Sequence, residues 1–274
     1  MVARTVGLLV AAAALLGFTG VSAQGEGGVF QPLLADPKEP QFFATYLWDR
    51  SPRLSSRLAS VGLGQTISLI REPDWEVAIA AGVFSQFNMQ SATNDLINTD
   101  YLVGLPVTYR HGSWTTRFRL YHQSSHLGDE YLLHTHAQRV DLTFEAAELL
   151  VSKAIANWRV YGGGEYLFAH SPADLAPGVL HGGLEYRQPD SAVRLGRFAV
   201  GRLVAGLDGR SVQDRGWQVG WSGVTGLELA DPRAAPGSGW RWRVLLRAYT
   251  GPSPYGEFYR DPVSYVGLGI GFAL

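Results

Sequence analysis

The sequence predicts an all-β fold, a transmembrane antiparallel β-barrel of about twelve strands preceded by a cleaved signal peptide. Three observations support this fold class. Long segments alternate apolar and polar residues with the period of two that is typical of a strand. Short turns alternate with longer polar loops, and tryptophans recur at equivalent places after the short turns. Beyond the first 23 residues no segment is long and apolar enough for a membrane helix, so a closed barrel is the membrane structure that remains.

The composition is that of a glycine-rich, weakly charged chain. The 274 residues carry a formal net charge of −1, and 17% of them are charged, so neither a nucleic-acid partner nor a disordered tail is expected. Because there is no cysteine, thiolate zinc sites, disulfides and cysteine nucleophiles are excluded.

The amino-terminal residues have the pattern of a secretory signal peptide. Arg4 supplies a positive start, an apolar run extends from Val6 to Leu16, and Val21-Ser22-Ala23 is a small-residue cleavage site. The expected organisation is a signal peptide (1–23), a Gly/Pro-rich periplasmic lead-in (24–40) and an outer-membrane barrel (41–274).

Twelve segments have the length of tilted spanning strands: 41–48, 59–71, 74–87, 96–110, 113–126, 136–152, 157–169, 178–188, 192–207, 214–229, 239–250 and 263–274. Short turns are expected at 72–73, 111–112, 153–156 and 189–190, with a longer one at 231–238. Long polar loops are expected at 49–58, 88–95, 127–135, 170–177, 208–213 and 251–262. Since outer-membrane barrels have short periplasmic turns, the barrel should begin and end in the periplasm.

Four tryptophans independently support this orientation: Trp75, Trp114, Trp158 and Trp240. Each follows a predicted short turn within a few residues, as in an aromatic girdle at headgroup level. The alternative interpretation is cross-strand aromatic packing in a soluble sheet.

The segment 112–126 gives the clearest evidence for a barrel strand, and it also contains the one candidate catalytic group. One face holds Trp114, Thr116, Phe118, Leu120, His122 and Ser124. The other holds Thr115, Arg117, Arg119, Tyr121, Gln123 and Ser125. An apolar face opposite a charged face suits lipid outside and a polar lumen inside.

The same alternation predicts a charged lumen lined by Arg117, Arg119, Asp141, Glu145, Glu165, Glu185, Arg241, Arg243 and Arg247. Such a lining could form a narrow conducting pore or a closed network of arginine–carboxylate pairs. We favour a closed network, because glycines narrow the wall and no loop has the size of a constriction loop.

His122 and Ser124 point outward, near the outer end of their strand, where polar groups invite a functional interpretation. A serine nucleophile needs a base within reach, and residues two apart on one strand face can provide that pair. The third member should come from the next strand, where His136 or Gln138 lies opposite Ser124. The alternative is ordinary interfacial polarity at a strand end.

The outward His-x-Ser pair in RLYHQSSH resembles that of the outer-membrane phospholipase A and lipid A 3-O-deacylase families. The resemblance implies that Ser124 is the nucleophile and His122 the base, acting on outer-leaflet phospholipid or lipid A. Those families place an Asn or Glu further along, where this chain has His136. In addition, Ser125 stands where the deacylases carry an asparagine.

Most of residues 40–274 resembles a different bacterial family, known as domain of unknown function 1207. The resemblance is carried by DLINTDYLVGLP (95–106), RLYHQSSHLGDE (119–130) and YGGGEYLF (161–168). It implies a barrel of the Gram-negative outer membrane and no established activity.

No metal site or cofactor is expected. Four histidines lie around the loop 127–135 with Asp129 and Glu130, and calcium could use those two carboxylates. Two carboxylates fall short of the six or more oxygens that calcium needs. We expect these groups to meet solvent, lipopolysaccharide headgroups and outer-membrane lipids. The barrel-assembly machinery is the expected partner during biogenesis, because Phe272 lies near an apolar carboxyl terminus.

Two hypotheses about function follow. The first is a non-enzymatic barrel, structural or weakly conducting, with a narrow or occluded charge-lined lumen. The second is a lipid-facing serine esterase built on His122 and Ser124.

Overall fold

The computed structural model describes residues 22–23, 28–51, 55–233 and 240–273. The expected signal peptide lies outside this part of the chain, apart from the short strand β1 (Ser22–Ala23), which pairs with β3.

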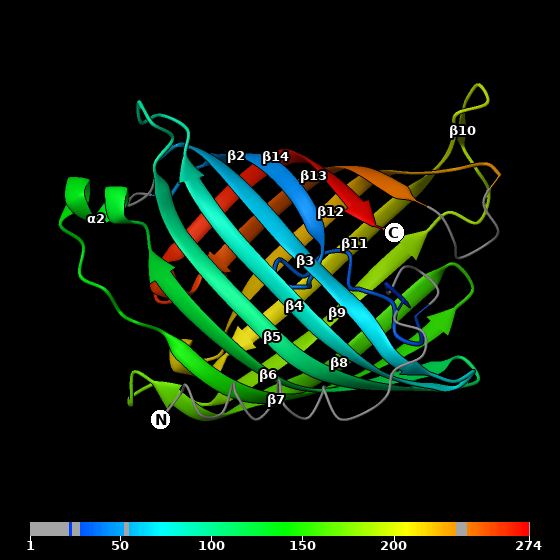
Figure 1. Cartoon of the computed structure of the whole chain (residues 1–274), viewed down its shortest axis with the longest axis horizontal. Coiled ribbons are helices and arrows are strands. Elements are labelled where there is room, and N and C mark those ends of the chain that lie inside the picture. The colour runs from blue at the N-terminus through cyan, green and yellow to red at the C-terminus, as the bar shows by residue number, and fades with distance from the viewer. Residues whose placement is uncertain (1–21, 24–27, 52–54, 234–239, 274) are drawn as a thin grey trace.

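Twelve long antiparallel strands close into a barrel (Figure 1). They are β2 (Phe42–Asp49), β3 (Arg57–Arg71), β4 (Trp75–Asn88), β5 (Leu96–His111), β6 (Trp114–Leu127), β7 (Thr143–Ile155), β8 (Trp158–Ser171), β9 (Gly178–Arg187), β11 (Ala199–Val212), β12 (Gln218–Ala230), β13 (Arg241–Pro252) and β14 (Pro262–Ala273). Each strand pairs with the next, and β14 pairs with β2, so the sheet has no free edge among these strands. The predicted fold class is confirmed.

The structure differs from the predicted strands mainly at two places. Residues 129–135, which were expected in a loop, form the helix α2 (Asp129–Thr135). An irregular stretch up to residue 142 replaces the start of the strand expected at 136–152, because β7 begins only at Thr143. Two acidic residues in the first turn of α2 and a left-handed residue at its carboxyl end favour this short helix. The strand expected at 192–207 is instead a small hairpin of β10 (Val193–Leu195) with the start of β11, which continues to Val212.

Turns and loops separate to the two ends of the barrel. The tight turn between β5 and β6 contains Gly112 with a φ of +58°, a left-handed conformation that glycine adopts without strain. The helix α2 and two 3₁₀ turns, η1 (Gln213–Arg215) and η2 (Gly256–Phe258), belong to the longer loops. In Figure 1, α2 and the β10 hairpin lie at opposite ends.

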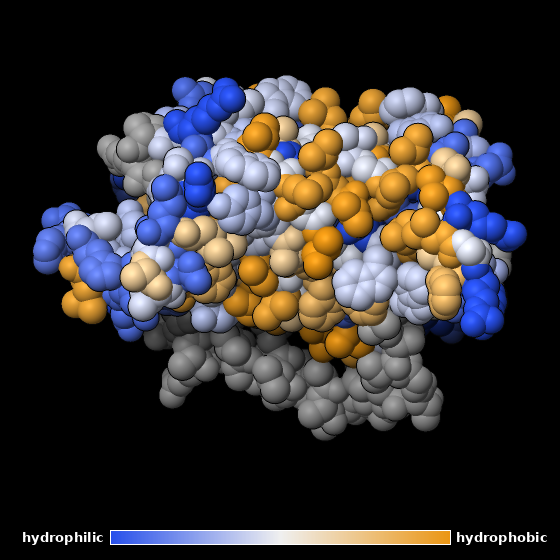
Figure 2. All heavy atoms as spheres, turned by 90° about the horizontal axis from the view of Figure 1, so that it is seen from above, coloured by the Kyte–Doolittle hydropathy of each residue, from blue (hydrophilic) through white to orange (hydrophobic). Residues whose placement is uncertain are grey.

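The outer wall carries the apolar face of each strand. Figure 2 shows hydrophobic residues along the middle of the molecule and hydrophilic residues at both ends. On β6, Phe118 and Leu120 are 42% and 44% exposed, whereas Arg117 and Arg119, which alternate with them, are buried. This is the inverse of a soluble protein and suits lipid around the barrel.

The tryptophans that follow the short turns face outward. Trp75, Trp114 and Trp158 are large exposed side chains at the starts of β4, β6 and β8. Trp240 is half-buried just before β13, and Trp242 packs its ring against Phe272 on the outer wall. This arrangement is that of an interfacial girdle.

None of the helices in the described part of the chain is both long enough and apolar enough to span a membrane.

The segment 28–41 lies inside the barrel. It is the described part of the stretch expected to be a periplasmic lead-in, and it is almost wholly buried. Phe30 and Leu33 pack against Leu150 and Tyr161, which are buried residues of β7 and β8. Leu34 and the adjacent alanine pack against apolar residues of β11, β12 and β13. The segment therefore fills the lumen as a plug; it carries no strand periodicity that would have predicted this position.

Side chains of the wall hold the plug at several heights. The Val29 amide donates to a Glu76 carboxylate oxygen at 3.1 Å, and the Leu34 amide donates to Glu185 at 2.7 Å. Arg159 donates to the Gln31 carbonyl oxygen at 2.7 Å. Polar backbone groups of an irregular segment need such partners when they are buried.

The loop between β13 and β14 covers the mouth of the barrel at the α2 end. Tyr255, Glu257 and Phe258 are each less than 9% exposed, and the Tyr255 hydroxyl hydrogen-bonds Ser60 on β3. The Gly256 amide donates to the Asp100 carboxylate at 3.2 Å. The β13–β14 loop is therefore part of the filling of the lumen, a position that the sequence analysis did not assign to it.

The plug predicts a barrel that does not conduct. In planar bilayers we expect the folded protein to show no stable conductance steps, because the buried plug and the inward side chains fill the centre of the lumen. A variant lacking both the plug residues 28–40 and the loop residues 253–259 should conduct, since twelve strands enclose more space than their own side chains fill. Folding of both proteins is checked by heat-modifiable mobility on gels. Equal conductance of the folded full-length protein and the deletion variant would contradict an occluding plug.

Candidate functional site

Most of the residues that were predicted to line the lumen do have side chains that face the interior of the barrel. Those whose side chains face the lumen are Arg117, Arg119, Glu165, Glu185, Arg241, Arg243 and Arg247. Two predicted lumen residues lie elsewhere: Asp141 is exposed before β7 begins, and Glu145 faces outward. On β7 the residues of opposite parity face inward, including Glu148, which sequence reasoning missed.

The centre of the lumen network is Glu148, which is fully buried. Arg117 donates to one of its carboxylate oxygens at 2.8 Å, and Arg119 donates to the other at 2.7 Å. Arg117 also donates to Glu39 of the plug at 2.7 Å. One guanidinium thus joins two strands of the wall to the plug, and each buried charge has an opposite charge beside it.

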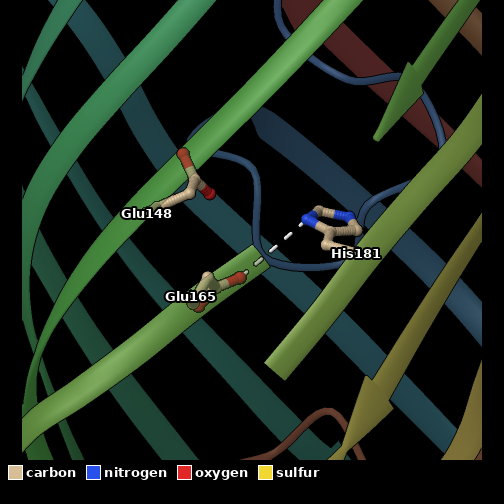
Figure 3. Close-up of side chains that lie close together, drawn as sticks. All are labelled: Glu148, Glu165 and His181. Atoms are coloured by element: carbon tan, nitrogen blue, oxygen red, sulfur yellow. Dashed lines mark ion pairs between the residues drawn. The ribbon is translucent and has the colours of Figure 1, made fainter. Parts of the chain in front are cut away.

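Glu148 belongs to a second group of side chains. Figure 3 shows Glu148 on β7, Glu165 on β8 and His181 on β9 pointing towards one another. Among the described residues, their donor atoms form the one group of three His, Asp or Glu side chains spaced for a metal ion, all within 4.8 Å. The Oε1 atom of Glu165 lies 3.9 Å from Nδ1 of His181, and both side chains are 0% exposed.

On the outer wall, the structure gives His122 a partner that sequence reasoning missed. Its Nδ1 lies 3.2 Å from Oε1 of Glu145 on β7. The two side chains are 14% and 25% exposed, and the two residues are direct neighbours in the β6–β7 ladder. A carboxylate on Nδ1 fixes the imidazole ring and leaves Nε2 for a proton transfer.

Ser124 lies two residues further along β6 on the same face and opposite Thr143. Among the hydrogen bonds of the described residues, none joins the Ser124 hydroxyl to His122. The spacing of about 7 Å between alternate residues of a strand brings two such side chains within reach through side-chain rotation. The structure therefore assembles a histidine–carboxylate pair with a serine next to it.

His136, the predicted third member, does not join this pair. It ends α2 in the left-handed region with a φ of 52°, and its amide donates to the Leu132 carbonyl oxygen at 2.9 Å. The helix and the irregular stretch after it delay β7, so the neighbour of His122 comes later in the chain than expected. The helix α2 was not expected from the sequence. The signal that could have revealed it is the acidic first turn of DEYLLHT, which was assigned to a loop.

The ladder beside Glu145 is irregular. Glu145 pairs with Ala169 of β8, but the next residue pairs with Leu167, so Phe168 is an extra residue in a β-bulge. Such bulges occur next to functional sites and change the direction of neighbouring side chains. Here Phe168 is 56% exposed on the outer wall, next to the strand that carries Glu145.

The depth of this group follows from strand geometry. Ser124 is ten residues after Trp114 on β6. At about 3.3 Å per residue and a tilt of about 40°, this separation is about 25 Å along the barrel axis. The apolar band of such barrels is also about 25 Å tall, so Ser124 lies at the interface opposite the Trp114 girdle.

Comparison with known proteins gives a family and a set of structural relatives. A family model described as "Protein of unknown function (DUF1207)" matches residues 4–274. The chain belongs to the DUF1207 family. No curated protein sequence matches this DUF1207 protein.

Among solved structures, the DUF1207 barrel is similar to outer membrane phospholipase A from Escherichia coli, with a TM-score of 0.59 and 14% identity. That match covers 89% of this chain and 93% of the other. The Salmonella typhi outer membrane phospholipase dimer with bound calcium is also similar, at a TM-score of 0.58 and 14% identity over 86% of this chain and 92% of that one. These likenesses show the fold: a barrel of the outer-membrane type.

From the ion pairs in the lumen of the DUF1207 barrel, we expect removal of Arg117 to destabilise the folded state strongly. We expect Arg117→Met to lower the free energy of unfolding by about 3–5 kcal/mol, because Glu39 loses a buried ionic partner and Glu148 loses one of two. Guanidinium-induced unfolding of the refolded barrel measures the change. Arg139→Met is the matched control, since its exposed pair with Asp129 should contribute less than about 1 kcal/mol. A similar loss in both variants would contradict a special role for the lumen pair.

Proposed function

We propose that this DUF1207 barrel is a lipid-facing serine acyl hydrolase of the bacterial outer membrane. Ser124 is the nucleophile, His122 the general base, and Glu145 the residue that orients and stabilises the histidine. The observation that carries the proposal is the hydrogen bond of 3.2 Å between His122 Nδ1 and Glu145, on an outer wall whose exposed large side chains are mainly apolar.

The chemistry needs this set of groups. Ser124 Oγ attacks the carbonyl carbon of an acyl ester while His122 Nε2 takes the hydroxyl proton. The histidine then gives the proton to the leaving alcohol, and an acyl-serine forms. Water, activated by the same histidine, releases the fatty acid and restores the serine. Glu145 stabilises the imidazolium in both steps.

The Ser124–His122 hydrogen bond must form when the substrate binds. Hydrogen bonds of catalytic groups are often long or misaligned without substrate and tighten in the complex. The serine needs rotation about one side-chain bond, because strand β6 already holds both residues on one face.

The position of the pair supports a lipid substrate. Polar and ionisable side chains facing lipid are unfavourable away from the interface. A site about 25 Å from the Trp114 girdle lies where ester groups of outer-leaflet phospholipid or lipid A meet the barrel wall. If the longer loops face the outside, the α2 end of the barrel lies in the outer leaflet, where lipopolysaccharide surrounds it. The fold likeness to proteins described as outer membrane phospholipases is consistent with this proposal.

A second candidate function is that of a structural barrel without enzymatic activity. The filled lumen is the observation that supports it. The plug 28–41 and the loop 253–259 are largely buried inside the barrel, which supports a filled lumen and not an open channel for solutes. On either proposal, the barrel-assembly machinery is the partner during biogenesis.

The test is acyl release by the refolded protein in nanodiscs that contain phospholipid or lipid A. We expect turnover by the wild type, and a loss of at least about a thousandfold in Ser124→Ala and His122→Ala. Glu145→Gln should retain the fold and lose a smaller factor, about tenfold to a thousandfold, because the orienting charge is removed but the nucleophile and base remain.

Thr116→Ala is the matched control, because it removes an outward hydroxyl from the same strand near the opposite interface. It should leave acyl release unchanged. A fluorophosphonate probe should label the wild type at Ser124 and the Ser124→Ala variant not at all. Equal release by wild type and Ser124→Ala would remove the serine from the mechanism and leave the structural barrel.

A further inference from the structure

We propose that Glu165 and His181, deep in the lumen, bind one divalent transition-metal ion of the zinc type. The site is independent of the proposed hydrolase, because these residues lie on the other side of the barrel wall from His122 and Ser124.

Two buried donor atoms in this place have no hydrogen-bond partner. They are Oε1 of Glu165 and Nδ1 of His181, and no partner is found for either within the described residues. They face each other across 3.9 Å, and both side chains are 0% exposed (Figure 3). That distance is too long for a hydrogen bond. Two ligand atoms that each bind zinc at about 2.0–2.2 Å lie about 3.4 Å apart in a tetrahedral site, so an approach of about half an ångström brings both to bonding distance of one ion.

The second nitrogen of His181 has the partner that metal-bound histidines need. Its Nε2 lies 2.7 Å from Oδ2 of Asp208 on β11, and Tyr161 donates to the same oxygen at 2.7 Å. With Nε2 protonated and donating to the carboxylate, the lone pair of Nδ1 points towards Glu165. Histidine ligands of zinc commonly have this support from a carboxylate, which fixes the tautomer and raises the basicity of the ligand.

Charges around the pair also favour a cation. The ion-paired and hydrogen-bonded groups that surround it contain six buried carboxylates, Asp36, Glu39, Asp100, Glu148, Glu165 and Asp208. Four cationic side chains accompany them, Lys38, Arg117, Arg119 and Arg210. With His181 neutral, the excess is two negative charges, which one divalent ion compensates. Protonation of His181 would remove only one of these charges, so a divalent ion compensates the set more fully.

Glu148 completes the donor set. One of its carboxylate oxygens lies within 4.8 Å of the other two donor atoms, so a small inward movement brings it to bonding distance. Its oxygens already accept from Arg117 and Arg119, and each carboxylate oxygen can serve a second partner. Nitrogen and carboxylate donors of this kind suit zinc and its neighbours better than calcium, which needs six to eight oxygens.

A cavity lies between Asp208 and the loop that covers the mouth of the barrel at the α2 end. It has a volume of about 100 Å³, and its polar lining includes Lys38 of the plug with Asp208 and Arg210 of the wall. Asp208 both lines this cavity and accepts the hydrogen bond from His181, so only the Asp208 side chain separates an ion in the cavity from the donor pair. Once bound, the metal would join the neighbouring strands β7, β8 and β9 on the lumen side of the wall, beside the plug.

The test uses the refolded full barrel after treatment with a chelator, titrated with Zn²⁺ alone. We expect binding of one equivalent and a higher melting temperature with Zn²⁺ than without. His181→Gln and Glu165→Gln should each weaken binding by more than tenfold, and Asp208→Asn by about 10–100-fold. Binding should also weaken as pH falls, because protons compete for the histidine nitrogen.

His126→Gln is the matched control, since His126 is exposed on the outer wall, and it should bind Zn²⁺ like the wild type. X-ray absorption of the zinc-loaded wild type needs no variant to fold, and it should show an imidazole nitrogen at about 2.0 Å. The proposal is overturned if no equivalent of Zn²⁺ binds, if the bound ion lacks an imidazole, or if folded His181→Gln binds as tightly as the control.

Discussion

The pairing of buried charges inside a closed cylinder is the constraint on which the rest of this structure depends. Twelve strands leave a central space that their own side chains do not fill, and the backbone of every strand must be hydrogen-bonded within the wall. Here the space is filled by a segment of the same chain, and charged side chains fix it. Arg117 meets Glu39 of the plug and Glu148 of β7 at once, so the interior is a single network rather than a lining around water.

The alternation of strand residues turns one wall into two chemical environments. Gln123 is buried in the lumen, whereas His122 and Ser124 on either side of it face outward. One strand therefore contributes to the charged interior and to a group of polar residues on the lipid face. A rigid wall suits such a group, because elements of regular structure hold side chains more closely than loops do.

Strand periodicity predicted most of the fold because it is a local property of each segment. The faces of β6 and the inward arginines of β13 follow from residue parity alone. The errors arose where parity has to be counted across an interruption. The helix α2 was not expected, so β7 was started too early and its parity was reversed, which placed Glu145 inside and left Glu148 out.

The position of the plug and the carboxylate partner of His122 could not be predicted from the sequence, because both depend on contacts between distant parts of the chain. Residues 28–41 have no period, because an irregular segment in a lumen is held by wall side chains from distant parts of the sequence. Only three-dimensional pairing shows that Val29 meets Glu76. The His122–Ser124 pair is local and was predicted to share the outward face. Its carboxylate partner depends on register between two strands, which the sequence of either strand does not specify.

That register links the interior to the outer site. In the β6–β7 ladder, Arg119 is the direct neighbour of Glu148, and three residues along His122 is the direct neighbour of Glu145. A slip of one residue would send Glu148 to the lipid and separate both pairs, while a slip of two would keep each face but break both contacts. The buried arginine–carboxylate pair opposes either slip because an unpaired charge in the lumen is strongly unfavourable. The lumen network thus holds the histidine and its carboxylate together on the far side of the wall, although it touches neither.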